Sequence, residues 1–194
     1  MRLLGFLLLA ALSLRAQTLD IYWIDSEGGG STLNKTPAGQ GILIDSGNPG
    51  ARDSGRIIKV ASEEAGLKQI DFFILTHFHT DHFGGAAEIS ERLPIRTIYD
   101  NGIPEQNPDN NPKDTRWPLL IKPYRSYKAD ARKVIQPGDI LPLRQGEGDA
   151  KLSLRCIAAK QKFVSTPGGK ENPLCSQAKP KDKDMSDNAN SVVM

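Results

Sequence analysis

Three histidines and an aspartate lie within six residues of the chain and offer ligands for metal ions. These three histidines are all that the sequence contains, and they fall in T-H-F-H-T-D-H, residues 76–82. Histidines at i and i+2 project to the same side of an extended backbone, so His77 and His79 can close on one ion. The turn that follows brings Asp81 and His82 towards a second ion. Imidazole nitrogen and carboxylate oxygen are ligands that zinc takes at about 2.0–2.2 Å, and an open coordination position would make the site catalytic.

The alternative for this segment is a polar loop whose side chains are satisfied by backbone hydrogen bonds. That is the usual state of a lone histidine. Three histidines with an aspartate between them favour the metal interpretation, and zinc is the ion that the ligand types predict.

The elements on either side of the segment are suited to hold it in place. Residues 70–76, I-D-F-F-I-L-T, form a continuous apolar run typical of a buried strand. Residues 84–89 open a short helix that Pro94 stops. The four candidate ligands therefore lie in a loop between a rigid strand and a helix.

The rest of the chain alternates between expected strands, helices and polar loops. Alternating or apolar runs predict strands at residues 19–24, 31–33, 39–47, 96–99, 138–143, 151–158 and 191–194. Apolar residues at helical spacing predict a helix over 51–66. The triple glycine at 28–30 reads as a flexible turn, and residues 101–114, rich in Pro and Asn, as a long surface loop.

The first 16 residues have the composition of a secretory signal peptide. Arg2 precedes an apolar run that ends at Arg15, and Ala16 is a small residue before Gln17. The alternative is a membrane anchor, but a spanning helix needs about 20 apolar residues. We expect residues 1–16 to be removed, residues 17–194 to form one domain without a membrane segment, and the product to be secreted or periplasmic.

Two cysteines, Cys156 and Cys175, are the only ones in the chain. An exported protein meets an oxidising compartment, so a disulfide between them is expected. The alternatives are two unrelated thiols or a metal site, and the metal site is the weaker because neither cysteine has a second ligand nearby in sequence.

The charge of the chain does not identify a macromolecular partner. The formal net charge is +2, and the Lys and Arg residues are scattered. This pattern gives no basic footprint for nucleic acid. A small-molecule or phosphodiester substrate is the expected partner, and the oligomeric state is not encoded in any pattern we found.

The loop motif resembles the His-x-His-x-Asp-His signature of the metallo-β-lactamase superfamily. G-I-L-I-D-S-G at 41–47 also resembles an early strand of that superfamily, and the likeness runs over about residues 19–100. It is closest to the exported branch related to competence-protein (ComEC-like) hydrolase domains. That branch has a glycine turn and an Asn-x-x-Ser segment, here 188–191.

The resemblance implies an α/β fold, the αββα sandwich, with the metal site along one edge of two facing sheets. It implies that His77 and His79 bind one zinc and that Asp81 and His82 bind a second. It further implies that Asp81 orients a metal-bound hydroxide that acts as the nucleophile. Asp45 would support the metal loop from beneath without binding metal, although an ordinary turn-capping aspartate accounts for the same residue.

The sequence departs from the family pattern after His82. No further histidine follows, and Asp182, Asp184 and Asp187 precede the last expected strand and not the turn where a bridging aspartate belongs. These absences predict that the chain is the N-terminal portion of the sandwich, incomplete at its C-terminus, and inactive by itself.

The expected function is that of a secreted zinc-dependent hydrolase acting on an ester, phosphodiester or amide bond. One alternative is a β-lactamase in the strict sense, and another is a non-catalytic metal-binding relative. A redox role is disfavoured because the di-iron members of the superfamily carry an acidic residue within the loop motif, where this chain has histidines.

Overall fold

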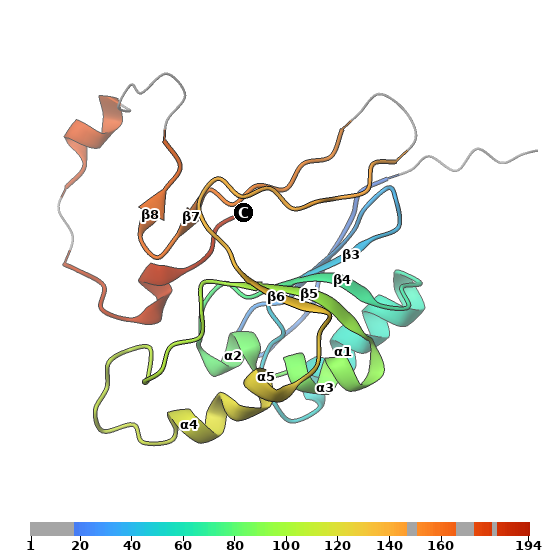
Figure 1. The fold of residues 1–194 in the computed structure, drawn as a ribbon, viewed down its shortest axis with the longest axis horizontal. Coiled ribbons are helices and arrows are strands. Elements are labelled where there is room, and N and C mark those ends of the chain that lie inside the picture. Colours follow the sequence, from blue (N-terminus) through green and yellow to red (C-terminus); the bar gives the residue numbers. More distant parts are fainter. Residues whose placement is uncertain (1–17, 147–150, 166–172, 180–181) are drawn as a thin grey trace, which may run out of the picture.

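A six-stranded sheet forms the centre of the computed structural model, which describes residues 18–146, 151–165, 173–179 and 182–194 (Figure 1). The strands follow one another across the sheet in chain order. The expected signal peptide, residues 1–16, lies outside the described residues. None of the helices in the described part of the chain has the length and apolarity that a membrane crossing requires.

The sheet is antiparallel in its first half and parallel in its second. β1, β2 and β3 form an antiparallel meander, and β3, β4, β5 and β6 pair in parallel. The strands are β1 (Asp20–Trp23), β2 (Thr32–Lys35), β3 (Gly41–Ile44), β4 (Ile70–Ile74), β5 (Ile95–Asp100) and β6 (Ala131–Val134). The expected α/β class is confirmed.

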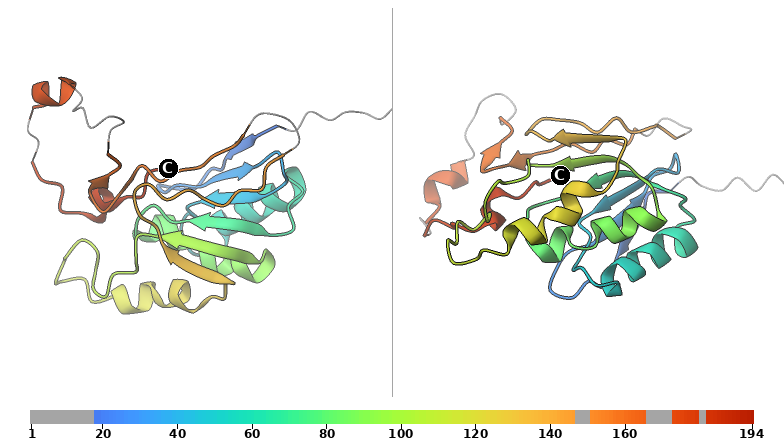
Figure 2. Two further views of the ribbon diagram at one scale, coloured as in Figure 1. Left: turned by 45° about the horizontal axis from the view of Figure 1, so that its top comes forward. Right: turned by 60° about the horizontal axis from the view of Figure 1, so that its bottom comes forward.

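Helices cover one side of the sheet, because parallel strands must be joined by crossovers that pack on its face (Figures 1 and 2). The five α-helices lie together on this side in Figure 1. They are α1 (Arg52–Lys59), continued by a π-helical turn η1 (Val60–Glu64), then α2 (Thr80–Phe83), α3 (Ala86–Arg92), α4 (Trp117–Leu120) and α5 (Lys122–Ser126).

The other side of the sheet is covered by extended chain that follows β6. Successive residues of a strand face opposite sides, so Phe73 of β4 packs among the helices while Phe72 and Ile74 pack on the opposite face. That second core also includes Tyr99 of β5 and Val192 near the C-terminus. All five residues of β4 are buried, which explains its unbroken apolar sequence.

The region after β6 differs from the expected strand pair. Residues 138–143 and 151–158 run antiparallel through backbone hydrogen bonds, but only the bridge between Ile140 and Arg155 forms between them. Two short strands, β7 (Ala158–Ala159) and β8 (Lys162–Phe163), make a separate hairpin, and the 3-10 helices η3 (Pro173–Gln177) and η4 (Asp187–Asn190) follow. The expected strand at 191–194 contributes a bridge between Ala158 and Val193.

The expected disulfide pairs Cys156 with Cys175, whose side chain lies outside the described residues. Cys156 is a free cysteine in this structure. Its side chain is fully buried in the second core. The Sγ atom lies 3.4 Å from the carbonyl oxygen of Ala158, to which the thiol donates. Cys156 therefore serves as a small buried apolar residue.

Candidate metal centre

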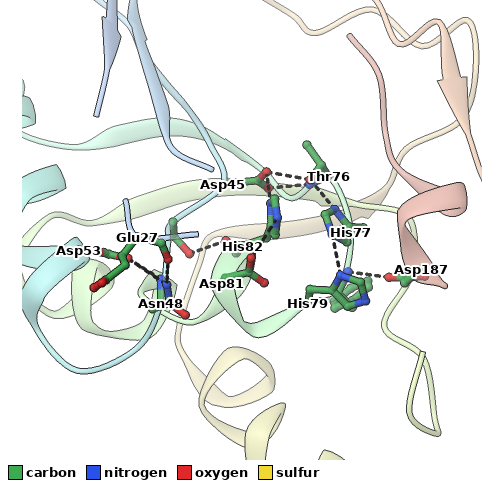
Figure 3. Close-up of polar contacts among 12 residues, drawn as sticks. Glu27, Asp45, Asn48, Asp53, Thr76, His77, His79, Asp81, His82 and Asp187 are labelled. Carbon is green, nitrogen blue, oxygen red and sulfur yellow. Dashed lines mark hydrogen bonds and ion pairs between the residues drawn. The ribbon is translucent and has the colours of Figure 1, made fainter. Parts of the chain in front are cut away.

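The carboxyl end of β4 carries the metal loop, which we define as residues 76–82 (Figure 3). The chain is still extended at His79, where φ is −86° and ψ is 146°, and α2 begins at the next residue. His77 and His79 therefore precede the helix, whereas Asp81 and His82 lie on it. The structure thus brings the four expected ligands together as two pairs.

The first pair consists of His77 and His79. The Nε2 atom of His77 lies 3.1 Å from the Nδ1 atom of His79. Two nitrogens bound to one tetrahedral zinc ion at about 2.0–2.1 Å would be about 3.3 Å apart, so the pair is already close to a chelating geometry. The other nitrogen of His77, Nδ1, lies 2.9 Å from Oγ1 of Thr76.

The second pair consists of Asp81 and His82. The Nε2 atom of His82 lies 3.7 Å from Oδ2 of Asp81, and its Nδ1 atom lies 2.7 Å from Oδ2 of Asp45. The rings of His77 and His82 are 4.0 Å apart between centroids. The two pairs are therefore neighbours, as two adjacent metal ions would require.

Each of the three imidazoles has one nitrogen held by an oxygen and the other turned towards a neighbouring candidate ligand. Metal-binding histidines usually show this arrangement, because the outer hydrogen bond fixes the ring and its tautomer. The holding oxygens belong to Thr76 for His77, Asp109 for His79 and Asp45 for His82. The inward nitrogens are Nε2 of His77, Nδ1 of His79 and Nε2 of His82.

Asp45 lies beneath the metal loop and connects its two ends. Its Oδ1 atom accepts the backbone N–H of Thr76 at 2.8 Å, and its Oδ2 atom accepts the Thr76 hydroxyl at 2.7 Å. Because that hydroxyl donates to Asp45, it accepts from Nδ1–H of His77. Asp45 has a φ of 59°, a region uncommon for residues other than glycine, and its own N–H donates to Ile74.

Charge and burial act differently on two of the histidines. Burial lowers the pKa of His77, and the neighbouring His82 and His79 lower it further. Burial also acts to lower the pKa of His82, but its hydrogen bond to Asp45 and the charges of Asp45 and Asp81 outweigh burial and raise it. The lowered pKa of His77 favours the neutral form that a metal needs, whereas the carboxylates raise the pKa of His82.

The glycine turn at 28–30 packs directly against the second pair. A Cβ atom at Gly29 would lie 1.9 Å from the carbonyl oxygen of Asp81, and one at Gly30 would lie 3.2 Å from Oδ2 of Asp45. The turn was expected to be merely flexible. In the structure its lack of side chains allows the turn between β1 and β2 to lie against the helix that carries Asp81 and His82.

Two aspartates that the sequence analysis did not assign to the site also contact the metal loop. Asp187 is buried, and its Oδ2 atom accepts the backbone N–H of Phe78 at 2.6 Å. Asp109 lies beside His79. Burial alone would raise the pKa of Asp109, but its hydrogen bonds with His79 and with the N–H of Asp187 lower the pKa below its usual value. The one sequence signal for Asp187 was its position next to the Asn-x-x-Ser segment.

The four candidate ligands fit a metal centre as two separate pairs. In the described ranges no three His, Cys, Asp or Glu side chains are grouped so that they could hold one ion together. Each pair would supply two of the four ligands that zinc takes. The fit rests on the inward nitrogens and on the oxygens that fix the three rings.

The fold and this loop define a class of mixed α/β proteins that display His-x-His-x-Asp-His at the end of a buried parallel strand. The family model described as "Metallo-beta-lactamase superfamily" matches residues 32–151, and the chain belongs to this superfamily.

The relatives of known identity are longer proteins, and only a part of each matches this chain. The coenzyme F420H2 oxidase of Methanothermobacter marburgensis (strain Marburg) is 26% identical over 102 residues, which are 52% of this chain and 22% of the oxidase. The subclass B3 metallo-β-lactamase BJP-1 of Bradyrhizobium japonicum shares the fold with a TM-score of 0.50 and 22% identity, over 76% of this chain and 52% of that one. A second subclass B3 structure, MEM-A1 from a soil metagenome library, has a TM-score of 0.49 and 15% identity over 76% and 53% of the two chains. The chain thus spans about half or less of these proteins.

Proposed function

We propose that this chain is a zinc-dependent hydrolase domain in which His77 and His79 hold one ion and Asp81 and His82 hold a second. The observation that carries the proposal is the anchoring of all three rings, each with one nitrogen on an oxygen and the other facing a partner ligand. A polar loop without a metal role would not need its imidazoles fixed in this way.

Zinc, when bound, lowers the pKa of water and stabilises anionic transition states, and this is the chemistry expected for an ester, phosphodiester or amide bond. The chain's own residues contribute orientation. Asp45 holds Thr76 and His82, and through the Thr76 hydroxyl it fixes the ring of His77. The burial of His77 keeps that ring neutral.

A polar recess beside the metal loop supports a polar substrate. It has a volume of about 460 Å³, and its lining includes Asn101, Asn107, Lys160 and Asp187. Amide groups and one lysine suit a substrate that offers hydrogen-bond acceptors or a negative charge. Asp187 belongs both to this wall and to the support of Phe78, and this shared residue supports a substrate position near the first pair.

We further propose that residues 1–16 direct export and that 17–194 is the domain that remains. Two features support placing the domain in the branch related to the competence-protein hydrolases. The glycine turn packs on Asp81, and the two residues that flank the segment 188–191, Asp187 and Val192, hydrogen-bond to the metal loop. The mass of the mature protein recovered from an oxidising compartment tests the cleavage site.

The first experiment measures zinc per chain after dialysis against metal-free buffer, for the unchanged protein and for His79→Ala, Asp81→Ala and Asp130→Ala. Asp130 lies at the far edge of the sheet and pairs with Arg96, so its variant is the matched control. We expect bound zinc in the unchanged protein and the control, and loss of zinc in the two loop variants. Equal zinc contents in all four proteins would contradict the assignment.

The second experiment assays zinc-loaded protein on chromogenic carboxylic ester, phosphodiester and amide substrates and on nitrocefin, with and without a chelator. Chelator-sensitive turnover of one of the first three supports the hydrolase. Turnover of nitrocefin alone indicates a β-lactamase in the strict sense. Zinc binding without any turnover fits a non-catalytic metal-binding relative and also the expectation that residues 17–194 are inactive by themselves; the same assay on a longer product of the gene separates the two.

A further inference from the structure

The long polar loop after β5 returns to the metal loop at Asp109. The Oδ1 atom of Asp109 lies 2.8 Å from Nε2 of His79, although the two residues are 30 positions apart. Both side chains are partly accessible, with 26% of His79 and 40% of Asp109 exposed. The two other rings are held by the buried Asp45 and the half-buried Thr76, so His79 is the imidazole whose orientation depends on a surface loop.

Asp109 is itself fixed by a closed path of hydrogen bonds. Its N–H donates to Oδ1 of Asn107 at 2.9 Å, and its Oδ1 atom accepts the N–H of Asp187 at 2.9 Å. The Asp187 side chain in turn accepts the N–H of Phe78, the residue between the first two histidines. The path therefore begins and ends in the metal loop, which restrains the position of the Asp109 oxygen relative to the ring of His79.

The hydrogen bond to Asp109 selects one of two tautomers of His79. A carboxylate only accepts, so Asp109 requires a proton on Nε2 of His79 and leaves Nδ1 with its lone pair. In the other tautomer Nδ1 carries the proton and can donate it to Nε2 of His77, which is 3.1 Å away. In that tautomer a hydrogen bond would join the two ligand nitrogens, and neither nitrogen would be free to bind a metal ion.

We propose that Asp109 is a positioning residue that keeps the first ligand pair open by holding His79 in the Nε2–H tautomer. The inference rests on the proposed function, since the open pair matters only if the pair binds metal. The loop 101–116 thereby has a role in the metal centre, because the carboxylate of Asp109 orients a ligand without binding the ion itself.

The test compares the full chain with Asp109→Ala, Asp109→Asn and Asp114→Ala. Asp114 lies on the same loop, and its carboxylate accepts from Arg116 and, at 3.3 Å, from Asn107, but not from a histidine, so its variant is the control for loss of a loop carboxylate without loss of the bond to His79. The asparagine carbonyl can accept from both Nε2–H of His79 and the N–H of Asp187, so Asp109→Asn is the conservative rescue.

Nitrogen NMR spectra of ¹⁵N-histidine-labelled, metal-free protein, recorded well above the ordinary imidazole pKa of about 6.5, show which nitrogen carries the proton. Zinc affinity by chelator competition and the melting temperature are measured on the same samples.

We expect Nε2–H at His79 in the unchanged protein, in Asp109→Asn and in Asp114→Ala, and a shift towards Nδ1–H in Asp109→Ala. Zinc affinity should fall about 10- to 100-fold in Asp109→Ala, the range seen when outer partners of metal-binding histidines are removed. Its melting temperature should match that of the control. An unchanged His79 tautomer in Asp109→Ala, or the same loss of affinity in Asp114→Ala, would overturn the proposal. If no protein binds zinc, the proposed function fails, while the metal-free spectra still decide whether Asp109 selects the tautomer.

Discussion

At the scale of single residues, the Thr76 hydroxyl is the link through which Asp45 fixes His77. It donates to Oδ2 of Asp45 and accepts from Nδ1 of His77. Valine has the same shape as threonine but can do neither, so Thr76→Val releases the His77 tautomer without removing a ligand. We expect zinc affinity to fall about tenfold or more.

Chelator competition measures the effect of Thr76→Val, and Thr97→Val in the middle of β5 is the control for the same chemical change. The two variants should differ in zinc affinity. If Thr76→Val binds zinc as tightly as the control, the hydroxyl has no part in preparing His77.

Gly29 sets how closely the turn at 28–30 approaches the second pair. Gly29→Ala would place a methyl carbon 1.9 Å from the carbonyl oxygen of Asp81, so that either the turn or α2 must move. Zinc binding should be weakened more than folding, because Asp81 and His82 lie on that short helix. Zinc per chain and the melting temperature measure the two effects.

Gly55→Ala is the control for Gly29→Ala, because Gly55 lies within α1 and a Cβ atom there meets nothing within 4 Å. Alanine in place of this helical glycine should raise the free energy of unfolding by about 0.5–1 kcal/mol and leave zinc binding unchanged. If Gly29→Ala retains two ions per chain, the close approach of the turn is not required by the site.

The four loop residues could be predicted from the sequence because their types and spacing are local. His77, His79, Asp81 and His82 fall within six positions, and an extended segment followed by a helical turn sorts them into two pairs. Asp187 could not be found in this way. It joins the metal loop at Phe78 across 109 positions, and such a contact depends on how the whole chain folds.

At the scale of elements, Glu88 of α3 holds the loop that leads into α1. Its carboxylate accepts the N–H groups of Gly50 and Ala51 at 2.8 and 2.9 Å and also the hydroxyl of Ser54. Ala51 has a φ of 68°, which a residue with a side chain adopts only when its surroundings impose it. Glu88 supplies part of that restraint.

The hydrogen bonds to Glu88 make its contribution depend on pH. Burial acts to raise the pKa of Glu88, but the bonds from Ser54, Gly50 and Ala51 outweigh it and lower the pKa below its usual value. The unfolded chain lacks these bonds and binds the proton more readily. The stabilisation is therefore complete above about pH 4.5 and is lost as the pH falls through the lower, folded-state pKa.

Urea unfolding of Glu88→Gln at neutral and acid pH measures this contribution, with the exposed Glu91→Gln on the same helix as the control. We expect Glu88→Gln to be about 1 kcal/mol less stable than the unchanged protein at neutral pH, because hydrogen bonds to the charged group are weakened. The difference should shrink on acidification. A difference that does not change with pH would mean that the charge of Glu88 is unimportant.

Most segments with strong periodicity were predicted correctly, whereas the strand pair expected at 138–143 and 151–158 is reduced to one bridge, and β6, α4 and α5 were not predicted. The alternating and apolar runs gave β1 to β5, and the helix expected over 51–66 appears as α1 and η1, ending before Gly66, where φ is 66°. α4 and α5 have only four and five residues, and each carries a proline in its first turn. Segments this short bury too few side chains to show a pattern, and their contacts with the rest of the molecule decide their structure.

At the scale of the whole molecule, the two cores on opposite faces of the sheet are built differently. Packed helices cover the first, and extended chain that includes Leu141, Cys156 and Val192 covers the second. The second core has no cross-link in the described residues, since Cys156 is a free cysteine. Apolar burial and the backbone hydrogen bonds between these segments stabilise it.

Thermal unfolding with and without a reductant tests this description of the second core. We expect the same melting temperature in both conditions, and a small loss of stability in Cys156→Ala from the missing sulfur atom. A disulfide closing a loop of this length would contribute about 3 kcal/mol. A clear drop in melting temperature on reduction would therefore show that Cys156 pairs in solution.

The chain-order arrangement of the sheet has a consequence for synthesis on the ribosome. Each new strand can pair with the strand released just before it, so the sheet can grow from β1 to β6 as the polypeptide emerges. The metal loop, however, has two backbone contacts with residues 187–192, more than 90 positions later. Phe78 donates to Asp187, and Thr76 accepts the N–H of Val192. During translation the histidines therefore emerge before all of their supports exist, and these two contacts form only after residues 187–192 have left the exit tunnel.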